Sequence, residues 1–314
     1  FADKVSIVTD QLYGIDIDFN AVEVARFSLL VVLLEGETLE TLPSGGSILP
    51  NLANNVIHGN SLVRPSPEYP EWLDEPIYAL DLLSMGFDEF DAVIGNPPYV
   101  STENMRKINV REFGIVESSY ATLARQWDKY FAFVEFGVGK LSNDGVIGVV
   151  IPNKWMTVVS ASSFRKMLAS EVHVNWLQNF TYHSVFEEKQ IYVCGLVASR
   201  HPREFMEYAE PTSIDDVTAA TPMHSLTREK WLPTPVADPW ILPADCHRRL
   251  LYWRFMPIPY RWGKSSRLET VSKHLQMMCF LLRSPSRIPM ARLLLTRSFV
   301  EVRPCSGGQL SAIC

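Results

Sequence analysis

Short apolar runs alternate with longer amphipathic stretches over about the first two hundred residues of this chain. The short runs have the length of buried strands, and the longer stretches have the apolar spacing of helices. This alternation constrains the fold strongly, because it is typical of a parallel sheet with helices on its faces. The predicted strands are residues 12–17, 56–57, 90–94, 146–151, 174–177 and 191–198, and the predicted helices are residues 20–34, 127–141 and 160–170. We therefore predict an α/β fold.

The pattern changes after residue 201. Seven prolines interrupt residues 202–245, which predicts a linker. Beyond about residue 254 the alternation is lost, and the segment is rich in Arg, Ser and Pro without a predicted element. We expect three parts: residues 1–201 as the α/β domain, residues 202–254 as a linker, and residues 255–314 as a tail of unassigned structure.

Charged residues are distributed unevenly along the chain. Residues 1–247 carry 17 basic and 33 acidic side chains, whereas residues 248–314 carry 12 basic and 2 acidic ones. The net charge of −6 therefore hides an acidic domain and a basic tail. A basic tail of this kind is typical of an arm that binds phosphates.

Cysteine spacing and hydropathy narrow the class of protein. The five cysteines show no CxxC spacing, so we expect neither a metal site nor a disulfide framework. No uninterrupted apolar run reaches membrane-spanning length, and the first residues do not have the pattern of a signal peptide. We expect a cytoplasmic protein without a membrane partner. Because the chain opens with Phe1 and not Met, we also expect the natural N-terminus to lie upstream.

The most specific local motif is Asp91–Tyr99, a buried strand that ends in Asn-Pro-Pro-Tyr. Pro97 and Pro98 have a fixed φ and no amide hydrogen, so nearby carbonyls can face a ligand. Asn96 adds a side-chain acceptor and Tyr99 an aromatic face. Together they suit a planar base whose exocyclic amine needs two acceptors, the Asn96 side-chain oxygen and the Pro97 carbonyl. A simple proline-rich turn after a strand explains the tetrapeptide equally well.

Asn-Pro-Pro-Tyr resembles the signature of S-adenosylmethionine-dependent amino methyltransferases, above all the gamma-class N6-adenine DNA methyltransferases of restriction-modification and phage-defence systems. The resemblance covers about residues 1–200. It implies a Rossmann-like methyltransferase sheet in residues 1–201, S-adenosylmethionine as cofactor, and Asn96, Pro97, Pro98 and Tyr99 as catalytic residues. It also implies that the target adenine is flipped out of the duplex into a pocket.

Two further motifs resemble the cofactor site of this family. Tyr13–Asp18 places Asp16 at the end of a strand, where the resemblance implies that its carboxylate binds the ribose hydroxyls and that Ile17 packs on the cofactor adenine. His58–Leu62 places Asn60 after the next strand, where it would bond the adenine amino group. Taken alone, each motif is equally typical of a turn.

A late motif, His183–Phe186, resembles the segment that supplies the second wall of the base pocket. Phe186 would pack on the flipped base opposite Tyr99, with Tyr182 and Tyr192 as rival aromatics. Asp128, before the helix at 127–141, would lie nearest the mouth of the site.

The sequence departs from the family at both ends. The glycine-rich first motif is absent, so we expect a sheet without the first strand and its loop, with unpaired backbone beside the strands that end at Asp16 and Asn96. We expect such a chain alone to hold cofactor poorly and to be inactive. Around Met278 and Cys279 one shifted reading frame must encode Asp-Val, in a stretch that resembles the start of the family's recognition domain. The tail from about residue 255 can therefore be a frameshift product, or else a genuine basic arm; the gene's nucleotide sequence decides.

The resemblance as a whole predicts methyl transfer to N6 of adenine in double-stranded DNA. Residues 202–254 would approach a target-recognition domain, and a restriction endonuclease and a specificity domain, fused or separate, would be partners. The alternatives are a protein-glutamine or RNA amino methyltransferase, since the same tetrapeptide suits an amide, and a non-catalytic remnant.

Overall fold

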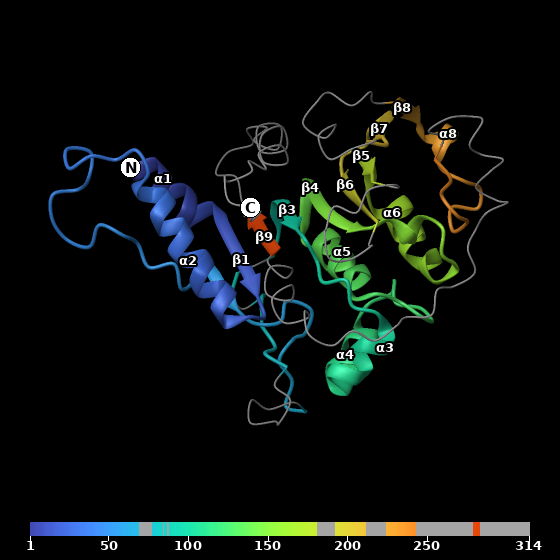
Figure 1. The fold of residues 1–314 in the computed structure, drawn as a ribbon, viewed down its shortest axis with the longest axis horizontal. Helices are drawn as coiled ribbons and strands as arrows, with labels where there is room; N and C mark the ends of the chain where they lie inside the picture. The colour runs from blue at the N-terminus through green and yellow to red at the C-terminus, as the bar shows by residue number, and fades with distance from the viewer. Residues whose placement is uncertain are drawn as a thin grey trace, which may run out of the picture.

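The computed structural model describes residues 1–68, 77–83, 85–86, 88–180, 192–211 and 224–242, together with the backbone of 279–282. Its centre is a sheet in the order β2-β1-β9-β3-β4-β6-β5-β7-β8 (Figure 1). The strands are β1 (Leu12–Asp16), β2 (Val56–His58), β3 (Phe90–Gly95), β4 (Leu141–Pro152), β5 (His173–Asn179), β6 (Val193–Ser199), β7 (Phe205–Ala209), β8 (His224–Thr227) and β9 (Cys279–Leu282).

The sheet is mixed rather than wholly parallel. β1 pairs with β2, β3 with β4, and β5 with β7 in parallel, whereas β6, β8 and β9 run antiparallel to their neighbours. The α/β class is confirmed, and the expectation of a parallel sheet holds only for part of it. Because β1 to β5 all point the same way, their carboxyl ends meet at one edge, where such sheets bind ligands.

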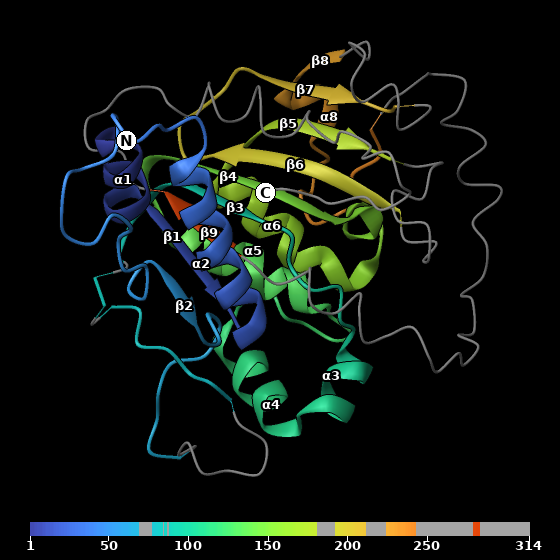
Figure 2. The same cartoon turned by 60° about the vertical axis from the view of Figure 1, so that its left-hand side comes forward.

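β9 fills the place between β1 and β3 that was expected to be empty. Its backbone pairs with Leu12–Ile15 on one side and with Ala92–Gly95 on the other. The expectation of unpaired backbone at these two strands is therefore wrong: a segment of the C-terminal tail satisfies both rows of amide and carbonyl groups. Figure 2 shows β9 lying between β1 and β3.

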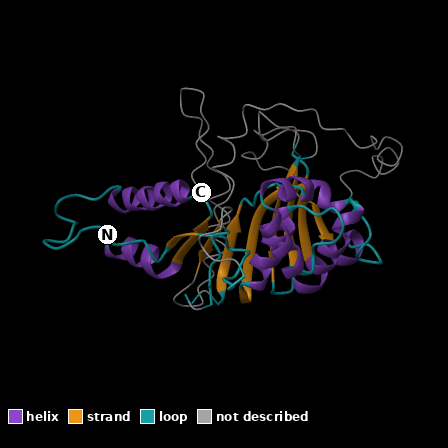
Figure 3. Ribbon diagram, turned by 90° about the horizontal axis from the view of Figure 1, so that it is seen from below, coloured by secondary structure: helices purple, strands orange, loops and turns teal. Residues whose placement is uncertain are grey.

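Helices flank this sheet. They are α1 (Ala2–Ser6), α2 (Phe19–Leu34), α3 (Thr102–Ile108), α4 (Val110–Ser119), α5 (Lys129–Gly139), α6 (Ser162–Glu171) and α8 (Arg228–Trp231), with a π-helical turn η1 (Ile7–Gln11) and 3₁₀ turns η2 (Asn153–Met156) and η3 (Val159–Ala161). The predicted helices correspond to α2, α5 and α6. Figure 3 shows the strands as one row, with helices packed along it and the α1–α2 pair beyond one end.

Two local features adjust the predicted elements. The helix predicted at 20–34 begins at Phe19, because the Asp18 carboxylate caps α2 by accepting from the amides of Asn20 and Ala21. The strand predicted at 146–151 begins earlier, and residues 143–145 form an irregularity in its pairing with β3. Gly145 is required there, since a Cβ would lie 3.0 Å from the Phe90 carbonyl oxygen.

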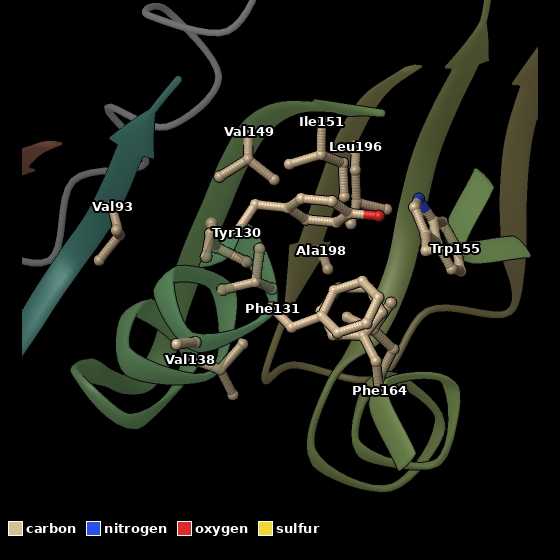
Figure 4. Packing of buried hydrophobic residues seen from close by; sticks show 14 of the residues in the cluster. Val93, Tyr130, Phe131, Val138, Val149, Ile151, Trp155, Phe164, Leu196 and Ala198 are labelled. Atoms are coloured by element: carbon tan, nitrogen blue, oxygen red, sulfur yellow. The ribbon is translucent and has the colours of Figure 1, made fainter. Parts of the chain in front are cut away.

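The aromatic part of the largest core cluster lies between β4, β6, α5 and α6. Phe131 and Phe164 stack with ring centroids 4.6 Å apart, and Trp155 packs edge-on against Phe164 at 5.6 Å. Figure 4 shows these rings together with Tyr130, whose ring lies among Val149, Ile151, Leu196 and Ala198. Each fully buried ring of this size contributes roughly 1.5–3 kcal/mol. The packing of these rings holds α5 and η2 against the sheet, close to the edge where strands β1 to β5 have their carboxyl ends.

Residues 202–245, predicted as a linker, contribute structure to the same sheet. β7 pairs with β5 and β8 with β7. Trp231 and Trp240 are buried, and their rings contact each other at 5.0 Å, with Trp240 reaching Trp155 at 5.2 Å. The prolines of this segment therefore lie in loops between elements that pack on the same sheet. The domain boundaries themselves stay a prediction. Among the described residues no helix is long and apolar enough to cross a membrane.

Candidate active site

The Asn-Pro-Pro-Tyr tip follows β3 at the carboxyl edge. β3 ends at Gly95, and Pro97 and Pro98, which lack amide hydrogens, are buried directly after it. The Tyr99 hydroxyl lies 2.8 Å from Asn96 Oδ1 and 3.0 Å from the Val150 carbonyl oxygen, so its one hydrogen serves these two acceptors. Burial raises the pKa of Tyr99, which keeps this donor protonated. The structure therefore brings Asn96 and Tyr99 together.

Asp128 lies beside this tip. Residues 100–102 run alongside 127–129: the Lys129 amide donates to the Val100 carbonyl at 2.8 Å. The Asp128 carboxylate is buried and its Oδ2 lies 2.8 Å from Lys154 Nζ. Burial raises the pKa of Asp128, and the ammonium of Lys154 opposes that rise. The position of Asp128 next to the tip agrees with its predicted place at the mouth; its role stays a prediction.

A shallow hollow lies at the same edge, where β1 and β2 end. Asp16, Ile17 and Asn60 all line it, so the structure brings together the three residues predicted to bind cofactor. Gly59 also lines it, and a Cβ there would displace the Leu80 side chain.

Asp16 has the electrostatics of a ligand-binding acid. It is 2% exposed, and its Oδ1 accepts from the Asp18 amide at 2.7 Å. Its Oδ2 is buried without a hydrogen-bond partner among the described residues. Burial, with a smaller contribution from the Asp18 charge, raises the pKa of Asp16 to about 6. An orphaned buried acceptor is costly unless a ligand donates to it.

Asn60 differs from its predicted role in detail. Its Nδ2 donates to Glu112 Oε1 at 3.0 Å, and its Oδ1 accepts from the Leu62 amide at 3.1 Å. Lys129 Nζ lies 2.6 Å from the same Glu112 oxygen, and both charged side chains are buried. Asn60 therefore keeps only the second lone pair of Oδ1 for an adenine amino group.

Sequence reasoning missed several side chains that line the hollow, among them Lys129 and Phe133 on α5, and it missed Glu112, which contacts Asn60. The amphipathic pattern predicted the helix that carries Lys129 and Phe133. It did not predict that these two side chains would line the hollow. Glu112 lies on α4, which no pattern predicted. Its contact with Asn60 joins residues 52 positions apart.

The remaining predicted wall of the base pocket, Phe186, lies outside the described residues, as does its rival Tyr182. Tyr192 is described and 44% exposed, and its carbonyl accepts from the Asn153 amide at 3.0 Å. Within the described part of the chain, no three His, Cys, Asp or Glu side chains gather where they could hold a metal ion.

This fold and site define an α/β methyltransferase of the Rossmann-like class, with an Asn-Pro-Pro-Tyr tip and an acid-bearing hollow on one sheet edge. A model of the Eco57I restriction-modification methylase family matches residues 10–186, more than half of the chain, and the chain belongs to that family. The cofactor of this class is S-adenosylmethionine.

The relatives are much longer proteins. The type II restriction enzyme and methyltransferase RM.Eco57I of Escherichia coli is 31% identical over 242 residues, which cover 77% of this chain and 24% of the relative. The type II methyltransferase M.PaeR7I of Pseudomonas aeruginosa is 27% identical, covering 57% and 32%. Among solved structures, the M protein of the type I restriction enzyme EcoKI has 14% identity and a TM-score of 0.40, covering 72% and 41%. The chain thus spans about a quarter to a third of these curated relatives.

The residues of the hollow fit an adenosine-bearing cofactor. The unpartnered Asp16 Oδ2 offers a charged acceptor of the kind that ribose hydroxyls require. Ile17 and Phe133 supply apolar surface on which a purine can pack, and Asn60 Oδ1 lies on the same wall. The fit rests on the donor and acceptor chemistry of these side chains.

Proposed function

We propose that this chain is the catalytic part of a DNA methyltransferase that transfers a methyl group from S-adenosylmethionine to N6 of adenine, in a restriction-modification system of the cytoplasm. The observation that carries the proposal is the joint position of the Asn-Pro-Pro-Tyr tip and the Asp16 hollow on one sheet edge. Membership of a restriction-modification methylase family supports DNA as substrate.

Asp16 would hold the ribose of the cofactor and Asn60 would bond its adenine amino group, while Ile17 and Phe133 pack on the purine. When bound, S-adenosylmethionine supplies an electrophilic sulfonium methyl. Asn96 and the Pro97 carbonyl would accept the two hydrogens of the target amine and favour a pyramidal nitrogen whose lone pair can attack. Preorganised acceptors of this kind act by positioning and electrostatics.

Tyr99 would stack on the flipped adenine, with Phe186 on its other side. In the structure the Tyr99 hydroxyl donates toward Asn96 Oδ1. Entry of the base would therefore replace this contact by one from the target amine. The sulfonium methyl of the bound cofactor would pass to this nitrogen, with the thioether as leaving group, and the extra amine proton would then leave to solvent.

Radiolabelled methyl transfer tests the proposal. Because this chain alone is expected to be inactive, a longer chain that adds the glycine-rich first motif is assayed beside it. Each is incubated with labelled S-adenosylmethionine and with DNA, RNA or protein in separate reactions, and labelled DNA is digested to nucleosides. We expect label in N6-methyladenine for the longer chain and its loss in Asn96→Ala and Tyr99→Ala of that chain. Label in protein glutamine or in RNA would instead support one of the other amino-methyltransferase functions. Salt-sensitive DNA binding without any methylation would support a non-catalytic remnant.

We propose double-stranded DNA as partner, with a restriction endonuclease and a specificity domain, fused or separate. The E. coli relative is named as both restriction enzyme and methyltransferase, which supports a fused arrangement. If the endonuclease and the specificity domain are instead separate proteins encoded by neighbouring genes, we expect them to co-elute with this chain in size-exclusion chromatography.

A further inference from the structure

Helices α3 and α4 form a corner directly after the catalytic tip. Ser101 caps α3, and Asn109 ends α3 and caps α4 through the Glu112 amide. We call residues 106–111 the α3–α4 corner. In Figures 1 and 2 the two helices project from the sheet edge toward which β1 points, the edge that carries the tip. The corner therefore lies at the same sheet edge as the tip.

The corner differs in chemistry from the acidic domain around it. It exposes Arg106, Lys107 and Arg111 together with two aliphatic side chains, Ile108 at 61% and Val110 at 62% exposure. By contrast, residues 1–247 as a whole carry 33 acidic against 17 basic side chains. Within 102–111 the only carboxylate is Glu103.

The acidic groups near these cations are already engaged. Lys107 pairs with Glu103 at 2.6 Å, but both side chains are mostly exposed, and such pairs are weak and screened by salt. Glu112 is buried against Lys129, and Glu117 accepts from the Trp127 indole at 3.1 Å. A polyanion can therefore compete for the corner cations.

The corner is held in place by packing. The Phe113 ring stacks on Trp127 with centroids 5.4 Å apart, and the Arg106 guanidinium lies 4.5 Å above the Phe113 ring. Asn109 is buried and its side chain caps α4. Because these contacts order the corner before any ligand arrives, less conformational entropy is lost on binding.

We propose that the α3–α4 corner is a DNA contact surface: Arg106, Lys107 and Arg111 bind phosphates of the duplex beside the target base, and Ile108 and Val110 pack on the adjoining deoxyriboses. The proposal rests on the proposed function and names one surface for its DNA partner. Cations on a rigid helical element position a protein on the duplex without reading its sequence. Exposed aliphatic side chains among cations suit a sugar-phosphate surface better than open water.

Salt-dependent DNA binding tests the surface. The probe is a fluorescein-labelled duplex of arbitrary sequence, titrated by anisotropy between about 50 and 200 mM salt. The variant is Arg106→Gln/Lys107→Gln/Arg111→Gln, and the matched control is Lys166→Gln/Arg203→Gln/Lys230→Gln, three exposed cations elsewhere. We expect the corner variant to bind more weakly and to lower the salt slope by about 2 to 3, roughly one per lost phosphate contact. The control should lower it by less than about 1.

Other outcomes separate this proposal from the proposed function. Equal slopes for the corner variant and its control, with methylation of DNA by the longer chain that adds the glycine-rich first motif, would overturn the corner while the function stands. Absence of DNA binding by this chain, together with absence of DNA methylation by the longer chain, would overturn both. Ile108→Ser/Val110→Ser should weaken binding at unchanged salt slope; unchanged affinity would remove the aliphatic part of the proposal. Circular dichroism of each variant separates loss of contact from loss of fold.

Discussion

At the scale of single residues, Asp16 combines a proposed role in cofactor binding with a cost in stability. Its carboxylate is buried, one of its oxygens has no hydrogen-bond partner among the residues that the structure describes, and burial raises its pKa from 3.8 to about 6. A raised pKa means that folding favours the protonated form. The ionised carboxylate therefore costs stability above about pH 6, and this cost disappears as the pH falls toward 3.8.

We predict that Asp16→Asn stabilises the protein at neutral pH by up to about 3 kcal/mol and that the gain vanishes near pH 4. The same change should weaken S-adenosylmethionine binding by about 10- to 100-fold, because a charged acceptor is lost. Urea unfolding as a function of pH and calorimetric titration measure the two effects. Wild-type affinity should fall below about pH 6 while the affinity of the variant stays flat. A variant that is less stable at neutral pH would contradict this account.

The buried ion pair of Glu112 and Lys129 is a second place where the burial of charge affects the stability of the protein. We predict that Glu112→Ala costs about 3–5 kcal/mol, because it leaves the Lys129 ammonium buried without a counter-charge. Glu112→Leu/Lys129→Met should recover most of that loss, since two apolar groups can replace a buried pair. Denaturant unfolding measures both. The exposed pair of Glu103 and Lys107 is the control, and Glu103→Ala should leave the unfolding midpoint unchanged. A double variant as unstable as Glu112→Ala would contradict the pairing argument.

At the scale of elements, α6 joins residues 231–240 to the active-site edge through one arginine. Arg165 is 1% exposed; its Nε and Nη2 donate to the Ala237 carbonyl at 3.0 and 2.6 Å, and its Nη1 donates to Trp155 and Val158 at 2.7 and 2.8 Å. Trp155 belongs to η2, which also carries Lys154 beside Asp128. A segment whose proline content predicted a linker is thereby tied to the mouth of the site.

We predict that Arg165→Met destabilises the protein by about 3 kcal/mol, because buried carbonyls lose their donors. Amide exchange should rise first at residues 231–240, including the Trp240 amide that donates to Met156 at 2.7 Å. Hydrogen exchange read by mass spectrometry measures this. Lys166→Met, an exposed neighbour on the same helix, is the control and should change neither quantity. Uniform exchange across the chain would show that Arg165 does not act locally.

At the scale of the whole molecule, β9 joins the two halves of the sheet. It is the shared neighbour of β1 and β3, and it comes from residues 279–282 of the basic tail. Sheet continuity therefore depends on a segment almost two hundred residues away from β3 in the chain.

We predict that a chain ending at residue 254 loses cooperative unfolding, because β1 and β3 then expose backbone and apolar faces. A chain ending at residue 286 keeps β9 and should unfold like the full chain. Scanning calorimetry and light scattering measure the melting temperature and aggregation. Identical unfolding of all three chains would show that β9 does not support the sheet, and would favour a tail that is an accident of reading frame.

The sequence alone determined local features: where strands β1 to β6 and helices α2, α5 and α6 lie, and that Asp16 ends a strand while Asn60 and Asn96 come shortly after one. These could be predicted because hydrophobic periodicity and chain-breaking residues act within about ten neighbours, and because parallel strands deliver their ends to one edge. The tertiary structure alone decided that Glu112 meets Asn60, that Trp240 packs on Trp155, and that β9 lies between β1 and β3. Those contacts join residues that are far apart in the sequence. The local sequence pattern is compatible with many such contacts, and only the packing of the whole chain selects among them.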